Sequence, residues 1–169
     1  MARWLSPISI TATGFAPACW FHQANSVAEP EIRAMLPRGT SMLVTRLALL
    51  GSSKPELMRM LDRLEAASEL LADAKVDVIV FHCTAVSTFA PELAHSIRER
   101  IRSASGIKCF TTADAILHVL THVNAKRISL LTPYIDDVHD REIAFFEANG
   151  FQLNGAANLG STPIPRWLR

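Results

Sequence analysis

The clearest strand in this chain reads Val-Asp-Val-Ile-Val-Phe-His at residues 76–82. Four of its seven residues are β-branched, and a short apolar run of this kind is typical of a strand buried on both faces of a parallel sheet. Cys83 and Thr84 follow it directly, where the chain would turn into the next helix. A buried parallel strand needs neighbours on both sides, and the flanking sequence supplies candidates for them.

Strand-like and helical segments alternate on both sides of this strand. Upstream, we predict a strand at 41–50 and an amphipathic helix at 54–75, capped by Ser52 or Ser53. Downstream, a helix begins near Pro91, because proline is favoured in the first helical turn. This alternation predicts an α/β fold with a parallel sheet flanked by helices. The remaining predicted segments are a strand at 107–111, a helix at 113–123, a strand at 127–132 and a helix at 137–149 that Gly150 stops.

The order of these segments suits one complete α/β half and the start of a second, similar half. A faint internal repeat supports this, since Ile8–Thr11 echoes Ile128–Leu131. The predicted organisation is an N-terminal α/β domain at 1–123, the first β-α-β of a second α/β domain at 124–160, and an off-pattern tail at 161–169.

Composition excludes several classes of protein. Hydrophobic residues make up 49% of the 169 residues, which excludes a disordered chain. The 17 basic and 16 acidic residues give a net charge of +1 without a basic block, so we expect no nucleic-acid partner. No apolar run reaches about 18 residues, and polar residues interrupt the first twenty, so we expect neither a membrane span nor a signal peptide. Three cysteines without close pairing fit a reducing compartment, and we predict a cytoplasmic protein.

Two junctions between strand and helix are candidate sites, because ligands of parallel α/β sheets bind beyond the carboxyl ends of strands. At the first, Cys83 and Thr84 follow the best strand, and a helix N-terminus there would stabilise a thiolate. At the second, Tyr134 is the one tyrosine of the chain, and its phenol could donate a hydrogen bond to a carboxylate. From position alone, a space-filling cysteine and a half-buried packing tyrosine remain open alternatives.

Metal and nucleotide sites are not predicted. His118 and His122 stand four apart on a helix but lack a third ligand, and the acidic residues at 136–140 are better explained as helix-start acids. Neither a G-x-G-x-x-G nor a G-x-x-x-x-G-K-[ST] motif occurs. Cys19 and Cys109 lack a setting like that of Cys83, and we expect Cys109 to lie in a strand and fill the core.

Four stretches carry a family resemblance: Asn25–Glu31, which reads Asn-Ser-Val-Ala-Glu-Pro-Glu; His82-Cys83-Thr84; residues 109–120; and Leu131–Val138 with Arg141. Over about residues 25–160 the chain resembles the Asp/Glu racemase superfamily, and within it the maleate cis-trans isomerases and arylmalonate decarboxylases. The resemblance rests on the order and spacing of these stretches more than on any single motif.

This resemblance implies two α/β halves with a cleft between them, usually one cysteine from each half, and no cofactor. Cys83 matches the first-half cysteine, the nucleophile of the maleate isomerases. Asn25, Thr84, the backbone N–H of Ala85 and Tyr134 match positions that hold substrate carboxylates. The implied substrate is a small dicarboxylate: Cys83 thiolate adds to maleate, the new single bond rotates, and elimination gives fumarate. The alternatives are an amino-acid racemase, an arylmalonate decarboxylase relative, and a non-catalytic half-domain that binds a dicarboxylate or a partner chain. For Asn25 and Thr84, local helix capping is also open.

The chain departs from the family in three places. Residues 15–22 stand where the first strand should run into the Asn motif, and Pro17 disfavours a central strand. Ala85 replaces a hydroxyl residue of the decarboxylases. The second-half cysteine does not occur, and residues 161–169 no longer resemble the family. We therefore expect a truncated or frame-shifted member with impaired activity, whose exposed sheet edge and apolar surface cause self-association.

Overall fold

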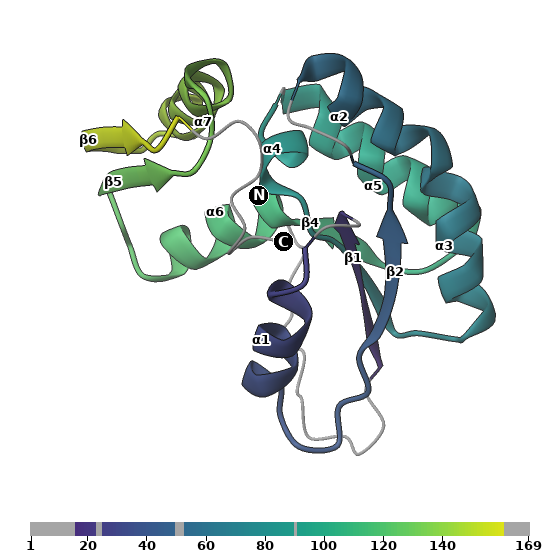
Figure 1. The fold of residues 1–169 in the computed structure, drawn as a ribbon. Helices are drawn as coiled ribbons and strands as arrows, with labels where there is room; N and C mark the ends of the chain where they lie inside the picture. The colour runs from purple at the N-terminus through teal and green to yellow at the C-terminus, as the bar shows by residue number, and fades with distance from the viewer. Residues whose placement is uncertain (1–15, 23–24, 50–52, 90, 161–169) are drawn as a thin grey trace.

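The computed structural model describes residues 16–22, 25–49, 53–89 and 91–160. Figure 1 shows a four-stranded sheet with helices on both faces and a separate two-stranded sheet formed by β5 and β6. The tail at 161–169, the repeat segment Ile8–Thr11 and the alternative cap Ser52 lie outside the described residues. The strands are β1 (Pro17–His22), β2 (Leu43–Leu47), β3 (Val78–Phe81), β4 (Cys109–Thr111), β5 (Arg127–Thr132) and β6 (Gln152–Asn158).

Every strand pairing within the two sheets is parallel, which confirms the predicted α/β class. The first sheet has the order β2-β1-β3-β4, and the second pairs β5 with β6. The helices are α1 (Ala28–Met35), α2 (Lys54–Met60), α3 (Leu64–Asp73), α4 (Thr84–Ser87), α5 (Pro91–Ser105), α6 (Thr112–His122) and α7 (Asp136–Ala148), with a 3₁₀ turn, η1 (Leu61–Arg63), between α2 and α3.

The position of β1 corrects one expectation. Pro17 was expected to disfavour a central strand, yet β1 lies between β2 and β3. Proline is tolerated here because it is the first residue of the strand, where its missing N–H costs least. The adjacent Ala16 anchors that end: its N–H donates to Asp77 Oδ2 at 2.7 Å, and its carbonyl accepts from the Asp77 N–H at 2.9 Å.

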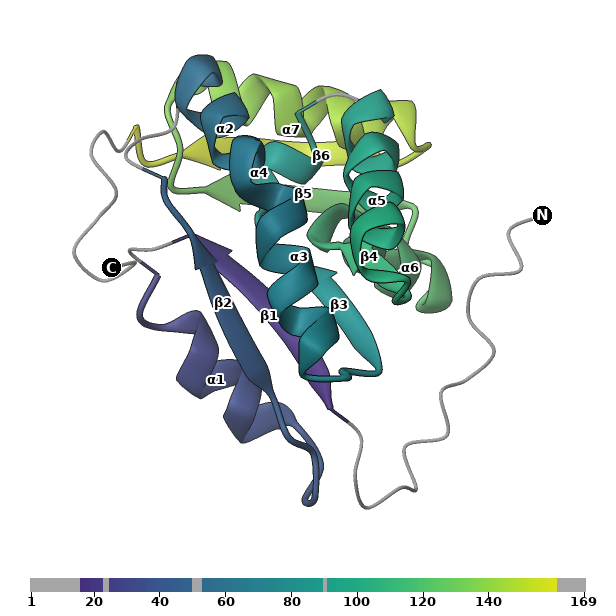
Figure 2. The ribbon, with the colours of Figure 1, turned by 90° about the vertical axis from the view of Figure 1, so that its right-hand side faces the viewer.

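Successive side chains along the strands of the first sheet point into two apolar clusters, one on each face. Ala18 and Ile79 belong to the larger cluster, together with residues of α2, α3 and α5. Cys19 belongs to a smaller cluster with α1, and Val80 packs against it. Figure 2 shows α3 and α5 lying across the sheet on the face opposite α1. Successive strand residues point to opposite faces, so a doubly covered sheet needs apolar side chains at nearly every position.

The predicted helix at 54–75 is interrupted by η1. It begins at Lys54, and Ser53, one of the two expected caps, precedes it: the Glu56 carboxylate accepts from the Ser53 N–H at 3.2 Å and from its hydroxyl at 2.5 Å. The interruption does not expose the apolar face, because Leu61 and Leu64 are both buried.

The segment at 124–160 forms β5, α7 and β6. The first turn of α7 contacts the main core, since Val138 belongs to the larger cluster and Tyr134 and Ile135 pack against it. Gly150 follows α7 with a φ of +85°, a left-handed conformation that favours glycine after a helix end. Within the described ranges, no helix is long and apolar enough to cross a bilayer.

We predict that Leu64→Ala destabilises the protein strongly and Leu70→Ala hardly at all. Both residues lie on α3, but Leu64 is 0% exposed in the core and Leu70 is 65% exposed. The Leu64 change should lower the free energy of unfolding by about 2–5 kcal/mol, and the Leu70 change by less than about 1 kcal/mol. Urea denaturation followed by circular dichroism measures both. Equal losses would contradict the assignment of Leu64 to the core.

Candidate functional site

Cys83 lies two residues beyond the end of β3, at the residue that precedes α4. Its backbone is extended, with φ −153° and ψ 102°, so the chain turns into the helix immediately after it. The side chain is free, partly exposed and packed against the larger cluster. The structure therefore places Cys83 at the carboxyl end of a central strand, as the sequence predicted.

The thiol of Cys83 is held protonated. Burial is the main cause that raises its pKa to about 11. A hydrogen bond from the Val86 N–H lowers this pKa, and the charge of the Glu142 carboxylate raises it. The sequence predicted the opposite direction, a thiolate stabilised by the following helix. The helix, α4, has only four residues, so its N-terminus contributes little against the loss of solvent.

Thr84 and Ala85 form the first turn of α4. The Thr84 carbonyl accepts from the Thr88 N–H at 2.9 Å and from the Thr88 hydroxyl at 2.8 Å. Ala85 is buried. Its N–H belongs to the first turn of the helix, where backbone N–H groups have no acceptor within the helix itself. The cap position itself is taken by Cys83, so the capping alternative for Thr84 does not apply.

Tyr134 lies between β5 and α7 and is partly buried against the larger cluster. Burial is the main cause that raises its pKa, and Cys83 and Glu142 both raise it further. The structure thus brings Tyr134 into the same region as Cys83, although 50 residues separate them. Its phenol is protonated at neutral pH and can act as a hydrogen-bond donor.

Asn25 is buried and bonds the start of α1 from two residues before its N-cap, Val27. Its side-chain oxygen accepts from the backbone N–H groups of Val27 at 3.2 Å and Ala28 at 2.9 Å. The backbone carbonyl of Asn25 accepts a hydrogen bond from Arg46 Nη1 at 2.7 Å. With the side-chain oxygen committed to the helix, only the amide N–H₂ could serve a ligand. Asn25 follows β1, and Cys83 follows β3, the neighbouring strand.

Glu142 on α7 is a site residue that the sequence analysis missed. It is 3% exposed, and its Oε1 has no hydrogen-bond partner. Burial raises its pKa to about 7, against the lowering effect of a hydrogen bond with Thr88. One signal was available in the sequence: Glu142 stands four residues after Val138 and four before Phe146, on the apolar face of the helix.

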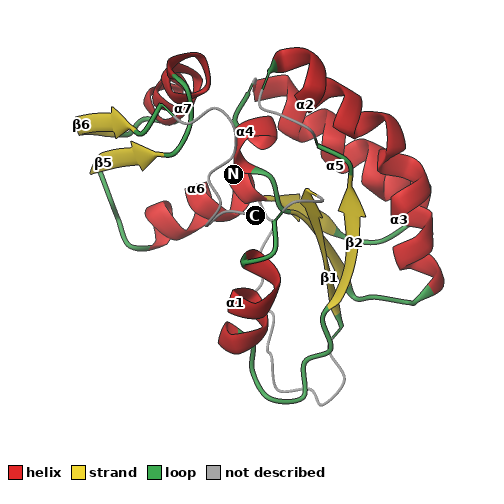
Figure 3. Ribbon diagram, viewed as in Figure 1, coloured by secondary structure: helices red, strands yellow, loops and turns green. Residues whose placement is uncertain are grey.

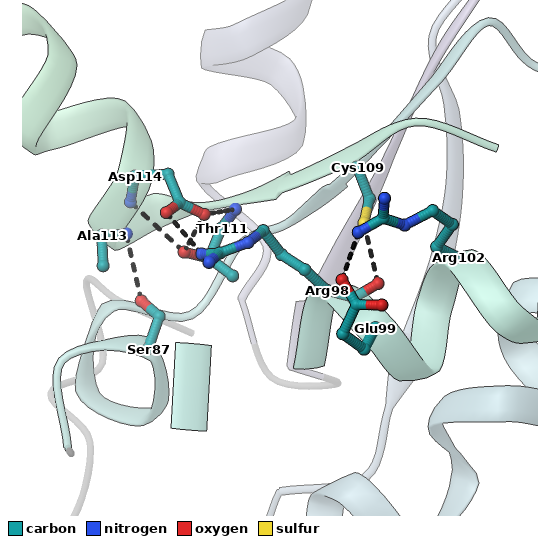
Figure 4. Close-up of polar contacts among 8 residues, drawn as sticks. All are labelled: Ser87, Arg98, Glu99, Arg102, Cys109, Thr111, Ala113 and Asp114. Carbon is teal, nitrogen blue, oxygen red and sulfur yellow. Dashed lines mark hydrogen bonds and ion pairs between the residues drawn. The ribbon is translucent and has the colours of Figure 1, made fainter. Parts of the chain in front are cut away.

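A polar network around the start of α6, shown in Figure 4, includes residues of α4, α5 and β4. The Ala113 N–H donates to Ser87 Oγ at 3.2 Å. Thr111 caps α6, and its N–H donates to Asp114 Oδ2 at 2.8 Å. The Arg98 guanidinium pairs with Asp114 at 2.6 Å. The Ser87 bond holds the short helix after Cys83 against the start of α6, which the Asp114 contacts fasten to β4 and α5.

Cys109 differs in part from its expected core position. It is the first residue of the edge strand β4 and is partly exposed, although it packs against the larger cluster. Its thiol donates to the Arg98 carbonyl at 3.3 Å (Figure 4).

The histidines and aspartates considered as metal ligands lie on α6 and α7. His118 and His122 are exposed on α6 with stacked rings 6.3 Å apart. Asp136 and Asp137 lie in the first turn of α7, and Asp136 accepts from Asn158 Nδ2 at 2.9 Å. Within the part of the chain that the structure describes, no group of three or more His, Cys, Asp or Glu side chains could hold a metal ion.

Fold and site together define an α/β protein with a cysteine at the carboxyl end of a central parallel strand. A family model described as arylmalonate decarboxylase matches residues 23–166, and the chain belongs to that family. This confirms the resemblance found in the sequence. The match also corrects one expectation, because it continues to residue 166, into the segment that was expected to depart from the family. Arylmalonate decarboxylase of Bordetella bronchiseptica is 35% identical over 69 residues, which is 41% of this chain and 29% of that protein.

Maleate isomerases match over a longer stretch. The protein of Geobacillus stearothermophilus is 24% identical over 150 residues, covering 80% of this chain and 60% of its own length. A solved structure of the Nocardia farcinica maleate cis-trans isomerase, a cysteine-to-serine mutant with a covalently bound succinylcysteine intermediate, gives a TM-score of 0.79 at 23% identity. It covers 87% of this chain and 64% of that chain, and it shows the shared fold. The chain thus spans less than two thirds of these relatives.

We predict that Asn25→Ala lowers the free energy of unfolding by about 1 kcal/mol, because the Val27 and Ala28 N–H groups at the start of α1 lose their side-chain acceptor. Asn25→Ser should lose much less, since serine is a comparably good capping residue. Urea denaturation of the two variants tests this. Equal losses from Ala and Ser would show that Asn25 stabilises the protein by something other than these bonds.

Proposed function

We propose that this chain carries the site of a cofactor-independent, cysteine-based isomerase that converts maleate to fumarate. The observation that carries the proposal is the position of Cys83, at the end of β3 beside Tyr134, in a chain of the arylmalonate decarboxylase family with maleate isomerase relatives. The three cysteines are free, which fits a reducing compartment, and we place the protein in the cytoplasm.

The proposed reaction starts from the Cys83 thiolate and ends with it, and it neither adds a proton to the substrate nor removes one. The Cys83 thiolate forms a C–S bond with one alkene carbon of maleate, and the alkene electron pair moves onto the adjacent carbon and its carboxylate. The former double bond is now single and rotates. The electron pair then returns to form the trans double bond, the C–S bond breaks, and thiolate and fumarate separate. In the Nocardia isomerase structure, the succinylcysteine adduct is what such an addition followed by protonation would form.

Four hydrogen-bond donors are assigned to the two carboxylates of the substrate. They are the Asn25 amide, the Thr84 hydroxyl, the Ala85 N–H and the Tyr134 phenol. Donors aimed at an oxygen that gains charge stabilise the transition state more than the ground state. The raised pKa of Tyr134 supports its role, because the phenol keeps its proton.

A second candidate function is a non-catalytic half-domain that binds a dicarboxylate. One observation favours it: burial raises the pKa of Cys83 to about 11, which keeps the thiol protonated. The family also includes decarboxylases, so decarboxylation of an arylmalonate and racemisation of an amino acid remain alternatives within the fold.

The decisive experiment follows maleate loss and fumarate formation with the purified chain. We expect turnover, at a low rate, that falls by at least about 10³-fold in Cys83→Ser because the nucleophile is lost. Cys109→Ser makes the same chemical change at a cysteine outside the site and should leave the rate unchanged.

Three outcomes would redirect the assignment. Turnover that survives in Cys83→Ser would overturn the cysteine mechanism. No turnover, with maleate protecting Cys83 from alkylation, would establish the binding half-domain instead. Release of CO₂ from an arylmalonate would make the chain a decarboxylase.

We also propose that the chain associates with itself through its second sheet. Figure 3 shows β5 and β6 apart from the four-stranded sheet, and Leu131 on β5 is 71% exposed. Exposed apolar residues beside an open strand edge favour pairing between chains. Val119, Val123 and Leu159 are also exposed.

In sedimentation velocity we expect species larger than the 18.6 kDa monomer, shifting toward the monomer in Leu131→Lys. Lysine on an edge strand discourages pairing. Leu70→Lys, which changes a similarly exposed leucine on α3, is the matched control and should not shift the distribution. A wild-type chain that sediments only as a monomer would contradict this proposal.

A further inference from the structure

The segment that carries Asn25 is held by an arginine of the neighbouring edge strand. Arg46 lies on β2, and Nη1 of its guanidinium donates to the Asn25 backbone carbonyl at 2.7 Å. Nη2 of the same group donates to Glu29 Oε2, in the first turn of α1, at 3.0 Å. The guanidinium is planar and presents its donors as a rigid fork. One side chain therefore fixes the segment before α1 and the start of α1 at the same time.

Glu29 is shared between two arginines, with one carboxylate oxygen for each. Oε2 accepts from Arg46, and Oε1 accepts from Arg33 Nη2 at 3.1 Å and from Arg33 Nε at 3.3 Å. Because Arg33 lies four residues further along α1, it holds the Glu29 carboxylate against the helix surface. All three side chains are partly exposed, and ion pairs at such positions contribute little to stability. Their main effect is on position.

The side-chain amide of Asn25 is the group that this arrangement orients. Asn25 is 8% exposed, and its Oδ1 accepts from the backbone N–H groups of Val27 and Ala28. These two donors identify the amide oxygen, so the amide nitrogen Nδ2 lies on the other side of the group. Nδ2 takes part in none of the hydrogen bonds among the described residues. A nearly buried amide with both N–H groups unused is suited to receive an oxygen of a ligand.

Sheet order places Arg46 on the opposite side of Asn25 from Cys83. β2 and β3 lie on the two sides of β1, and Arg46 pairs with Phe21 near the end of β1. Asn25 follows β1, and Cys83 follows β3 at the same edge of the sheet. The guanidinium thus holds Asn25 from the β2 side and leaves the side towards β3 to a ligand.

We propose that Arg46 is a positioning residue of the carboxylate-binding site: held by Glu29, it fixes the Asn25 peptide so that Nδ2 meets one carboxylate of the dicarboxylate. Arg46 acts through Asn25, because Nη1 and Nη2 are bonded to Asn25 and Glu29. Displacing a positioned group by about 1 Å can cost about 10²-fold in rate. The inference rests on the proposed function, in which Asn25 is assigned to a substrate carboxylate.

The test compares Arg46→Met with Arg100→Met. Arg100 makes the same combination of bonds between α3 and α5, on the face opposite α1 (Figure 2): its Nη2 donates to Glu65 Oε2 at 2.9 Å and to the Leu61 carbonyl at 2.6 Å. Methionine keeps an apolar stem of similar length and removes the guanidinium. Each variant loses one ion pair and one bond to a backbone carbonyl, but only Arg46→Met releases the Asn25 peptide.

The first measurement needs no ligand. It follows the side-chain N–H₂ signals of Asn25 in a ¹⁵N–¹H correlation spectrum, assigned by their absence in Asn25→Ala. In Arg46→Met these signals should move towards the shifts of a free amide, and in Arg100→Met they should stay in place. Arg46→Lys keeps the charge without the fork and should move them in the same direction, which decides the matter if Arg46→Met does not fold. An Asn25 amide that is unchanged in a folded Arg46 variant overturns the proposal.

The second measurement is protection of Cys83 by maleate against iodoacetamide, which reports binding with or without turnover. The maleate concentration for half protection should rise at least about tenfold in Arg46→Met and stay unchanged in Arg100→Met. Adding Arg46→Met to Asn25→Ala should cause no further loss, because Arg46 acts through Asn25. Losses that add in the double variant, or an equal loss in Arg100→Met, contradict the proposal. If maleate does not protect the wild type, the proposed function fails, and the amide spectrum alone decides whether Arg46 positions Asn25.

Discussion

The parallel pairing of β1 with β3 is the constraint on which the rest of the structure depends. It joins Ala18 to Ile79 and Cys19 to Val80, so each pair supplies one apolar layer on each face of the sheet. Helices can then cover both faces, which is the condition for a parallel sheet to be stable. The same pairing fixes direction: both strands end at one edge, where Asn25 and Cys83 follow them. The site is thus a consequence of sheet register more than of any local motif.

Much of this fold could be predicted because its strands and helices carry strong periodic signals. The run at 76–82 and the spacing of Leu57, Leu61 and Leu64 depend only on which faces are buried. The structure buries these three leucines and, within the run, Val76, Val78, Ile79 and Phe81. The hydrogen-bond pattern along that helix was not visible, because η1 keeps the same residues inward. The sequence does not show that Pro17 is the first residue of its strand. At the first residue, the general rule against proline has little force.

The candidate site could likewise be predicted only in part. The rule that ligands bind at strand ends, together with the family resemblance, pointed to Cys83 and Tyr134. The direction of the Cys83 pKa was wrong because the local sequence shows the helix after it but not the distant residues that bury it. Glu142 was missed because an acidic residue on a helix is usually solvated. Its burial depends on the packing of α7 beside α4, which becomes visible only when the two segments are placed in space.

The central place of β1 also has a consequence for how the chain folds during synthesis. β1 leaves the ribosome first among the described strands, and its partner β2 follows about 25 residues later. Its other edge stays open until β3 emerges about sixty residues after it. Contacts at such separations close large loops and form slowly. A nascent chain therefore carries an apolar strand with one open edge for most of the synthesis of the first sheet, which makes early chaperone contact with residues 17–22 an expected part of its biogenesis.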